Sequence, residues 1–115
     1  MAVLKRTLAV LIGMTIFLYP VFAAAPRDVV LSYDVPRGVL HVSAKHPTDR
    51  QDRYYIRLLV VYRNGEKAKE VEFHRQKSPA GMEEGVELEA KAGDNIRVEL
   101  FVSNGGSAKA EYTVP

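Results

Sequence analysis

Three histidines are the side chains of this chain best suited to metal or acid–base chemistry, because imidazole binds metal ions and titrates near neutral pH. His41 and His46 are five positions apart, an odd separation, so one continuous strand would direct them to opposite faces. A metal site would need a turn after His46 and a carboxylate such as Asp49 or Asp52. We therefore predict that His41, His46 and His74 are surface or loop residues, with the metal site as the alternative.

Acidic and aromatic residues offer weaker candidates. Four glutamates lie close together in the chain: Glu83, Glu84, Glu87 and Glu89. Paired carboxylates suit calcium binding or glycoside hydrolysis, but a solvated strand face also explains them, and we favour that explanation. Tyr54 and Tyr55 lie beside arginines and could stack on a ligand, although such residues usually belong to the core or edge of a strand. The chain contains no nucleophile elbow, phosphate-binding loop or HExxH motif.

Composition narrows the function classes further. The chain has 115 residues and no Cys, which excludes disulfides, cysteine-based zinc or iron–sulfur sites, thiol nucleophiles and a lipid-modified lipoprotein cysteine. The formal net charge of +2 is too small for a phosphate-binding surface, so we expect no nucleic-acid partner. Both excess charges are Lys5 and Arg6, and the rest of the chain is balanced.

The first residues have the order of a secretory signal peptide. Lys5 and Arg6 precede an apolar run over 8–18, and small residues follow Pro20. The run is too short to cross a bilayer comfortably. We predict cleavage after Ala23, with Ala25 as the alternative, which makes 1–23 the signal peptide and 24–115 the mature domain. The expected location is the periplasm or the exterior, with no membrane contact after cleavage.

Residues 24–115 show the two-residue alternation of β-strands and no convincing helix. Strands are expected over 29–33, 39–44, 54–63, 66–75, 86–90, 96–102 and 108–114. Asn64-Gly65 predicts a tight hairpin. Residues 76–82 are expected to form a loop, and 83–85 could form a short helical turn. About seven short strands with regular turns predict an all-β fold, an immunoglobulin-like antiparallel β-sandwich.

The order of these features resembles the iron-binding domain of superoxide reductases, the desulfoferrodoxin type, over 38–114. The shared features are His46-Pro47 after a strand, YYI at 54–56, and KAGDNIRVELFVSN followed by GGSAKAEYTV. The resemblance implies an immunoglobulin-like sandwich that holds iron through four histidines and a cysteine. Here His46 matches a ligand, whereas Tyr54 and Gly106 stand in place of histidines and Ser103 in place of the cysteine; Asn104 is retained. An alcohol does not replace a thiolate on iron, so the resemblance implies a degenerate metal site without a cofactor.

The chain also resembles the partner subunit of the thiosulfate-oxidation carrier complex, a small immunoglobulin-like sandwich with a His-Pro after an early strand and an Asn-Gly hairpin. This resemblance implies a metal-free binding role in the handling of sulfur compounds.

We therefore expect a non-catalytic module that binds another envelope protein or a small ligand. The expected binding residues are His46, Tyr54, Ser103 and Asn104. The alternatives are the sulfur-carrier partner and an iron-binding, superoxide reductase-like enzyme with a non-standard site.

Overall fold

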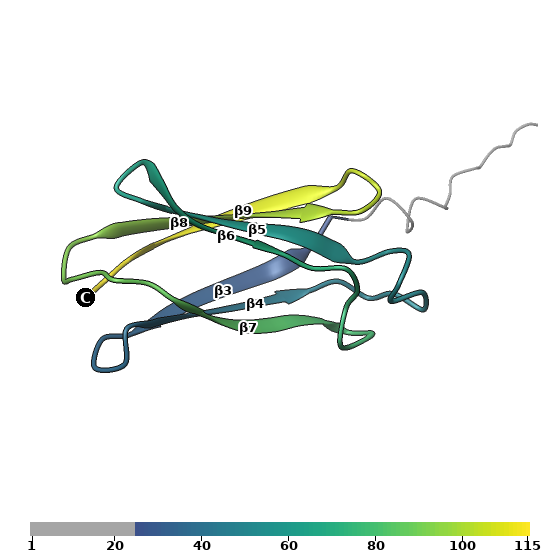
Figure 1. Cartoon of the computed structure of the whole chain (residues 1–115), viewed down its shortest axis with the longest axis horizontal. Helices are drawn as coiled ribbons and strands as arrows, with labels where there is room; N and C mark the ends of the chain where they lie inside the picture. Colours follow the sequence, from purple (N-terminus) through teal and green to yellow (C-terminus); the bar gives the residue numbers. More distant parts are fainter. Residues whose placement is uncertain (1–24) are drawn as a thin grey trace, which may run out of the picture.

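The computed structural model describes residues 25–115, and these form seven antiparallel β-strands (Figure 1). The strands are β3 (Arg27–Asp34), β4 (Val39–Lys45), β5 (Ile56–Arg63), β6 (Glu66–Glu72), β7 (Gly81–Glu87), β8 (Asn95–Val102) and β9 (Ser107–Thr113). The predicted signal peptide lies outside the described residues. Among residues 25–115 there is no helix of the length and apolarity needed to cross a membrane.

The strands form two sheets that pack face to face, a three-stranded sheet in the order β3-β4-β7 and a four-stranded sheet in the order β6-β5-β8-β9 (Figure 1). Alternate side chains from both sheets are buried between them, among them Leu40 and Val42 of β4 and Val98 and Leu100 of β8. The predicted immunoglobulin-like β-sandwich is therefore confirmed.

The sandwich is closed on one side only. β3 lies against β9, which links the two sheets along that side, whereas β6 and β7 make no comparable contact. The chain crosses from one sheet to the other on this second side, through the segment 73–80 between β6 and β7. The open side is therefore where a cavity between the sheets is expected.

The predicted hairpin at Asn64-Gly65 is present. Both residues have positive φ angles, 53° and 86°, as a type I′ turn requires. The Asn64 side chain also joins this hairpin to the turn before β8, because its amide donates to Asp94 Oδ1 (3.1 Å) and its carbonyl oxygen accepts from the Asn95 backbone (2.9 Å).

The hydrogen bonds to Asp94 predict a pH dependence of stability. The Asn64 amide and the Lys91 backbone N–H (2.9 Å from Oδ2) lower the pKa of Asp94 from its usual 3.8. Because the pKa of Asp94 is lower in the folded state, its carboxylate stabilises the fold above about pH 3.8. This stabilisation disappears as the pH falls through the folded-state pKa. For Asp94→Asn we expect a lower Tm than wild type at neutral pH and a difference that shrinks in acid. Thermal unfolding at a series of pH values checks this.

Asp49→Asn is the matched control, because Asp49 is an exposed loop carboxylate without an ion pair among the described residues. A Tm difference for Asp94→Asn that stays constant from neutral pH into acid would contradict the expectation.

The sequence predictions for β7, and the regular alternation expected for β5, are wrong in part. β7 begins at Gly81, so part of the expected loop 76–82 and all of the expected helical turn 83–85 are strand, and the strand ends at Glu87 instead of Ala90. β5 has an irregularity between Ile56 and Leu58 in its pairing with β8. The irregularity reverses the alternation, so that Ile56 is buried while Leu58 faces outward.

Candidate functional site

The predicted binding residues lie at one end of the sandwich, where β4 and β8 end and β5 begins. His46 follows β4 directly, Tyr54 precedes β5, and Ser103 and Asn104 follow β8. Hydrogen bonds between Ser103 and the backbone of Arg53 and Tyr55 bring the loop after β8 against the loop before β5. The contacts of each residue, however, give them different tasks.

His46 lies in the loop after β4, as predicted, but it is buried, with 4% of its surface exposed, so it is not a surface residue. Its Nδ1 lies 2.8 Å from Oε1 of Gln76, which is also buried. The same oxygen accepts from the Ile56 backbone N–H (3.1 Å), and Gln76 Nε2 donates to the carbonyls of His46 (2.9 Å) and Ser78 (3.0 Å). Gln76 thus joins the end of β4, the start of β5 and the segment before β7.

These backbone contacts indicate which ring nitrogen of His46 donates to Gln76. The carbonyls of His46 and Ser78 need a donor, so the side-chain nitrogen of Gln76 must face them. The Ile56 N–H needs an acceptor, so the side-chain oxygen of Gln76 must face it. Because an amide oxygen only accepts, His46 Nδ1 must carry the proton that it shares with Gln76. Sequence analysis assigned His46 to binding, but these contacts give its ring a structural task.

Ser103 also has a structural task. Its hydroxyl donates to the Arg53 carbonyl (2.7 Å) and accepts from the Tyr55 N–H (3.2 Å), while its own N–H donates to the Tyr55 carbonyl (2.9 Å). The residue at the position that resembles the thiolate ligand therefore connects the chain before β5 to the end of β8.

Tyr54 and Asn104 are closer to solvent. The Tyr54 ring is half-buried and has the Arg53 guanidinium over it at 5.5 Å from the ring centre. Asn104 is exposed. Of the two, Tyr54 offers an aromatic ring for contact with another molecule.

The alternative metal centre is not assembled. His41 is exposed on β4, whereas His46 is buried beyond the end of that strand. Within residues 25–115 no three His, Cys, Asp or Glu side chains are grouped closely enough to hold a metal ion.

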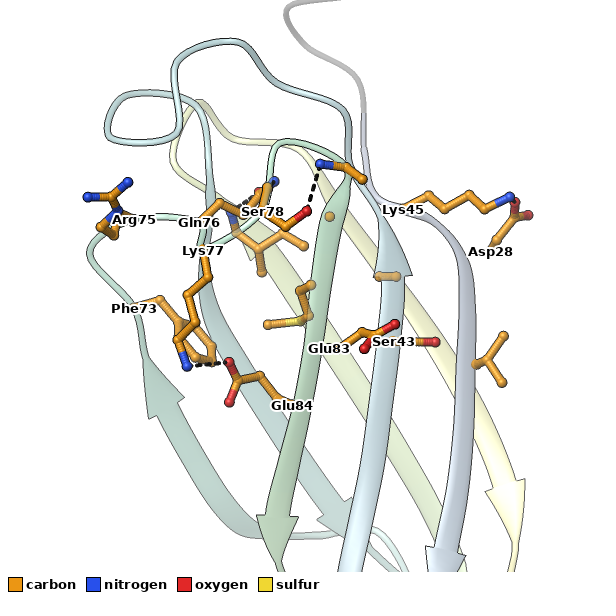
Figure 2. A pocket seen from close by; sticks show the side chains of 16 residues that line it. Asp28, Ser43, Lys45, Phe73, Arg75, Gln76, Lys77, Ser78, Glu83 and Glu84 are labelled. Carbon is orange, nitrogen blue, oxygen red and sulfur yellow. Dashed lines mark hydrogen bonds and ion pairs between the residues drawn. The ribbon is translucent and has the colours of Figure 1, made fainter.

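A pocket lies beside these loops, on the open side of the sandwich, and Figure 2 shows its lining. Its volume is about 700 Å³. The apolar part of the lining comes from both sheets and from the connecting segment, and it includes Ala44, Ile56, Phe73 and Met82. None of the four predicted binding residues lines the pocket. Gln76 connects the pocket to these residues, because it lines the pocket and forms a hydrogen bond with His46.

Charged side chains stand around the pocket (Figure 2). Glu84 occupies an inward position of β7, between the buried Met82 and Val86, and its carboxylate lies 3.5 Å from Lys77 Nζ. Arg75 is exposed at the rim and makes no ion pair among the described residues.

Lys45 and Asp28 also line the pocket and form a second ion pair (3.3 Å), and Glu83 lines it without an ion pair among the described residues. The pocket therefore has an apolar floor, two neutralised pairs, one unpaired cation and one unpaired carboxylate.

No protein-family model, curated protein or solved structure matches this chain. The two family resemblances remain expectations, and the assignment of function depends on the site itself.

Sequence reasoning missed the residues that matter most at this end of the fold. Gln76 lies in a stretch that reads as a polar loop, and its partners are far away in the chain. Glu84 belongs to a glutamate cluster that we interpreted as solvated. The only available signal was its position two residues from both Met82 and Val86, which places it on the inner face once β7 is recognised as a strand.

Proposed function

We propose that this protein is an exported, non-catalytic binding module whose ligand site is the pocket between β7 and the segment 73–78. The ligand is a small molecule with an apolar body and a negative charge. The observation that carries the proposal is a pocket with an apolar floor and an unpaired arginine at its rim.

The size and lining of the pocket support this function. Ligand sites in proteins are typically clefts of about 300 to 1,000 Å³, lined mainly by apolar side chains with a few polar groups that orient the ligand. This pocket has about 700 Å³, a floor that includes Phe73 and Met82, and a rim that includes Arg75 and Lys77. Lys77 is already paired with Glu84 and Lys45 with Asp28, so the available cation is Arg75.

The pattern of 1–23 supports export, and the absence of cysteine is compatible with any redox compartment. We base no proposal on superoxide reductase chemistry, because Ser103 at the thiolate position holds the backbone of Arg53 and Tyr55. No contact among the described residues specifically favours the sulfur-carrier role.

The test uses the protein expressed from its full sequence and purified after export, with 1-anilinonaphthalene-8-sulfonate, an apolar anion, as the fluorescent probe. We expect saturable binding at one site. Arg75→Glu removes the cation and adds a repelling charge, so we expect affinity to fall about tenfold, which corresponds to about 1.4 kcal/mol. Phe73→Ala removes part of the apolar floor and should also weaken binding.

Arg50→Glu is the matched control. It makes the same charge change at an exposed arginine that does not line the pocket, so it should leave the affinity nearly unchanged. Thermal unfolding of each variant verifies that the fold is kept. Equal affinities for Arg75→Glu and Arg50→Glu would refute the proposed site.

A further inference from the structure

β7 is an uncovered edge of the three-stranded sheet. Among residues 25–115 it pairs with β4 alone, apart from one bridge between Ser78 and Gly81. The other edge strands are protected against further pairing. β3 and β9 lie against each other, and β6 carries Lys67 and Lys69 and has an irregularity in its pairing with β5. β7, in contrast, has a regular ladder with β4 and contains no lysine, arginine or proline.

The free edge of β7 presents the backbone of Glu83, Gly85 and Glu87. The Leu88 N–H donates to the Gly38 carbonyl (2.9 Å) at the end of the β4–β7 ladder, so the even-numbered residues of β7 face β4. The odd-numbered residues between them direct their N–H and C=O groups away from β4, toward the open side of the sandwich. A further strand is the partner that satisfies such a row of alternating donors and acceptors.

The side chains of these three residues give the edge a sign. Alternate residues of a strand share one face, so Glu83, Gly85 and Glu87 lie together on the outer face of the sheet, opposite the buried Met82 and Val86. Both glutamates are exposed and make no ion pair among the described residues. The unpaired charge along the outer side of this edge is thus entirely negative.

A depression of about 280 Å³ on the outer face adjoins the edge at Gly85. Its lining includes His41 and Ser43 of β4 and Glu83 and Gly85 of β7. Gly85 lies opposite His41 in the ladder and has no side chain to fill the space above it. Figure 2 shows the Glu83 side chain extending from β7 toward Ser43. A long side chain that enters over Gly85 therefore meets a carboxylate in the depression.

We propose that β7 binds an extended segment of another protein as a fourth, antiparallel strand of this sheet, and that this segment carries an arginine or lysine opposite Gly85. That residue exchanges two backbone hydrogen bonds with Gly85 and directs its side chain to the outer face. Its diagonal neighbours are Glu83 and Glu87, about 7 to 8 Å away and within reach of a long side chain. One cation then lies between two carboxylates, and apolar residues at the alternate positions lie beside Met82 and Val86.

The charge of β7 argues against a second copy of the same strand as the occupant. β7 carries three glutamates and no cation, so antiparallel pairing of two β7 strands brings like charges together and destabilises the sheet. The partner segment must supply the positive charge. The proposal does not depend on the ligand of the pocket, because Arg75, the unpaired cation of the pocket, takes no part in it.

The test uses the exported protein and a fluorescent peptide with blocked ends, Ser-Val-Thr-Val-Arg-Val-Thr-Val-Ser. We expect one-site binding, measured by fluorescence anisotropy, with a dissociation constant of about 10 to 100 µM. The variant E83Q/E87Q should bind about tenfold more weakly. The matched control E66Q/E72Q makes the same change at two exposed, unpaired glutamates of β6 and should leave the affinity unchanged.

Two methylated peptides separate strand addition from attraction of charge alone. In the proposed pairing the N–H of the peptide's arginine donates to the Gly85 carbonyl, so methylation of that nitrogen should weaken binding about tenfold or more. The N–H of the preceding valine points away from β7, and its methylation is the control, with little effect expected. Hydrogen exchange at the backbone amides of Glu83, Gly85 and Glu87 should slow in the complex, because these amides gain partners.

Three outcomes would overturn the proposal. Absence of peptide binding up to about 1 mM would exclude the site. Equal effects of the two methylations would leave only charge attraction. A larger change of peptide affinity in Arg75→Glu than in Arg50→Glu would place the peptide in the pocket. Binding of the anionic fluorescent probe to the pocket is measured separately, so the failure of one proposal is distinguishable from the failure of the other.

Discussion

Gly81→Ala is expected to lower the free energy of unfolding by about 3 kcal/mol or more, because the new methyl group would clash with neighbouring backbone atoms. A Cβ at Gly81 would lie 2.1 Å from the carbonyl oxygen of Ala44 and 3.0 Å from the backbone nitrogen of His46. Both are backbone atoms of β4 and its end, so relief requires that β7 move away from β4. The register Lys45↔Gly81 would be lost first.

Thermal or denaturant unfolding checks this prediction, and the expected decrease in Tm is about 12 °C or more. Gly105→Ala is the control, because Gly105 also has a positive φ, 105°, but a Cβ there would have no atom within 4 Å. That variant should lose only about 1 to 2 kcal/mol, the cost of the backbone conformation. Equal losses at the two positions would show that close approach of β7 to β4 is not what requires glycine.

Gln76→Leu is expected to cost about 3 kcal/mol or more, although the volume of the side chain hardly changes. The leucine removes an acceptor and a donor at once. His46 Nδ1 and the Ile56 N–H lose their acceptor, and the His46 and Ser78 carbonyls lose their donor. A buried polar group that loses its hydrogen-bond partner is still removed from water, and no hydrogen bond then offsets the free-energy cost of that removal.

Gln51→Leu is the control for this second substitution. Gln51 belongs to the same network but contributes one side-chain hydrogen bond, to the Gln76 carbonyl (2.8 Å), so about 1 kcal/mol is expected. If Gln76→Leu were no more damaging than Gln51→Leu, the network would not hold the two sheets' ends together as we describe.

The fold could be predicted because its signals are local. The alternation of β8, for example, needs only the identities of neighbouring residues, and Asn64-Gly65 specifies its turn by itself. β7 could not be predicted over its whole length, because Gly81, Gly85 and Glu84 are poor strand formers. It is a strand because its neighbour β4 offers a complete ladder of partners.

The site was less accessible to sequence analysis, since its decisive contacts join distant residues. The bond between His46 and Gln76 spans 30 positions and leaves no periodic or motif signal. The pocket combines β3, β4, β5, β7 and the segment 73–80, so none of these segments reveals it alone. The sequence therefore does not reveal the hydrogen bonds that His46 and Ser103 make at this end of the fold.

The open side between β6 and β7 has a mechanical consequence. On the side where β3 lies against β9, each sheet resists sliding past the other. On the opposite side, Ile56 of one sheet and Met82 of the other face the same pocket. A molecule bound there touches both sheets at once. Its binding would therefore make the sandwich stiffer against sliding of one sheet past the other, on the side where the protein's own strands oppose that sliding least.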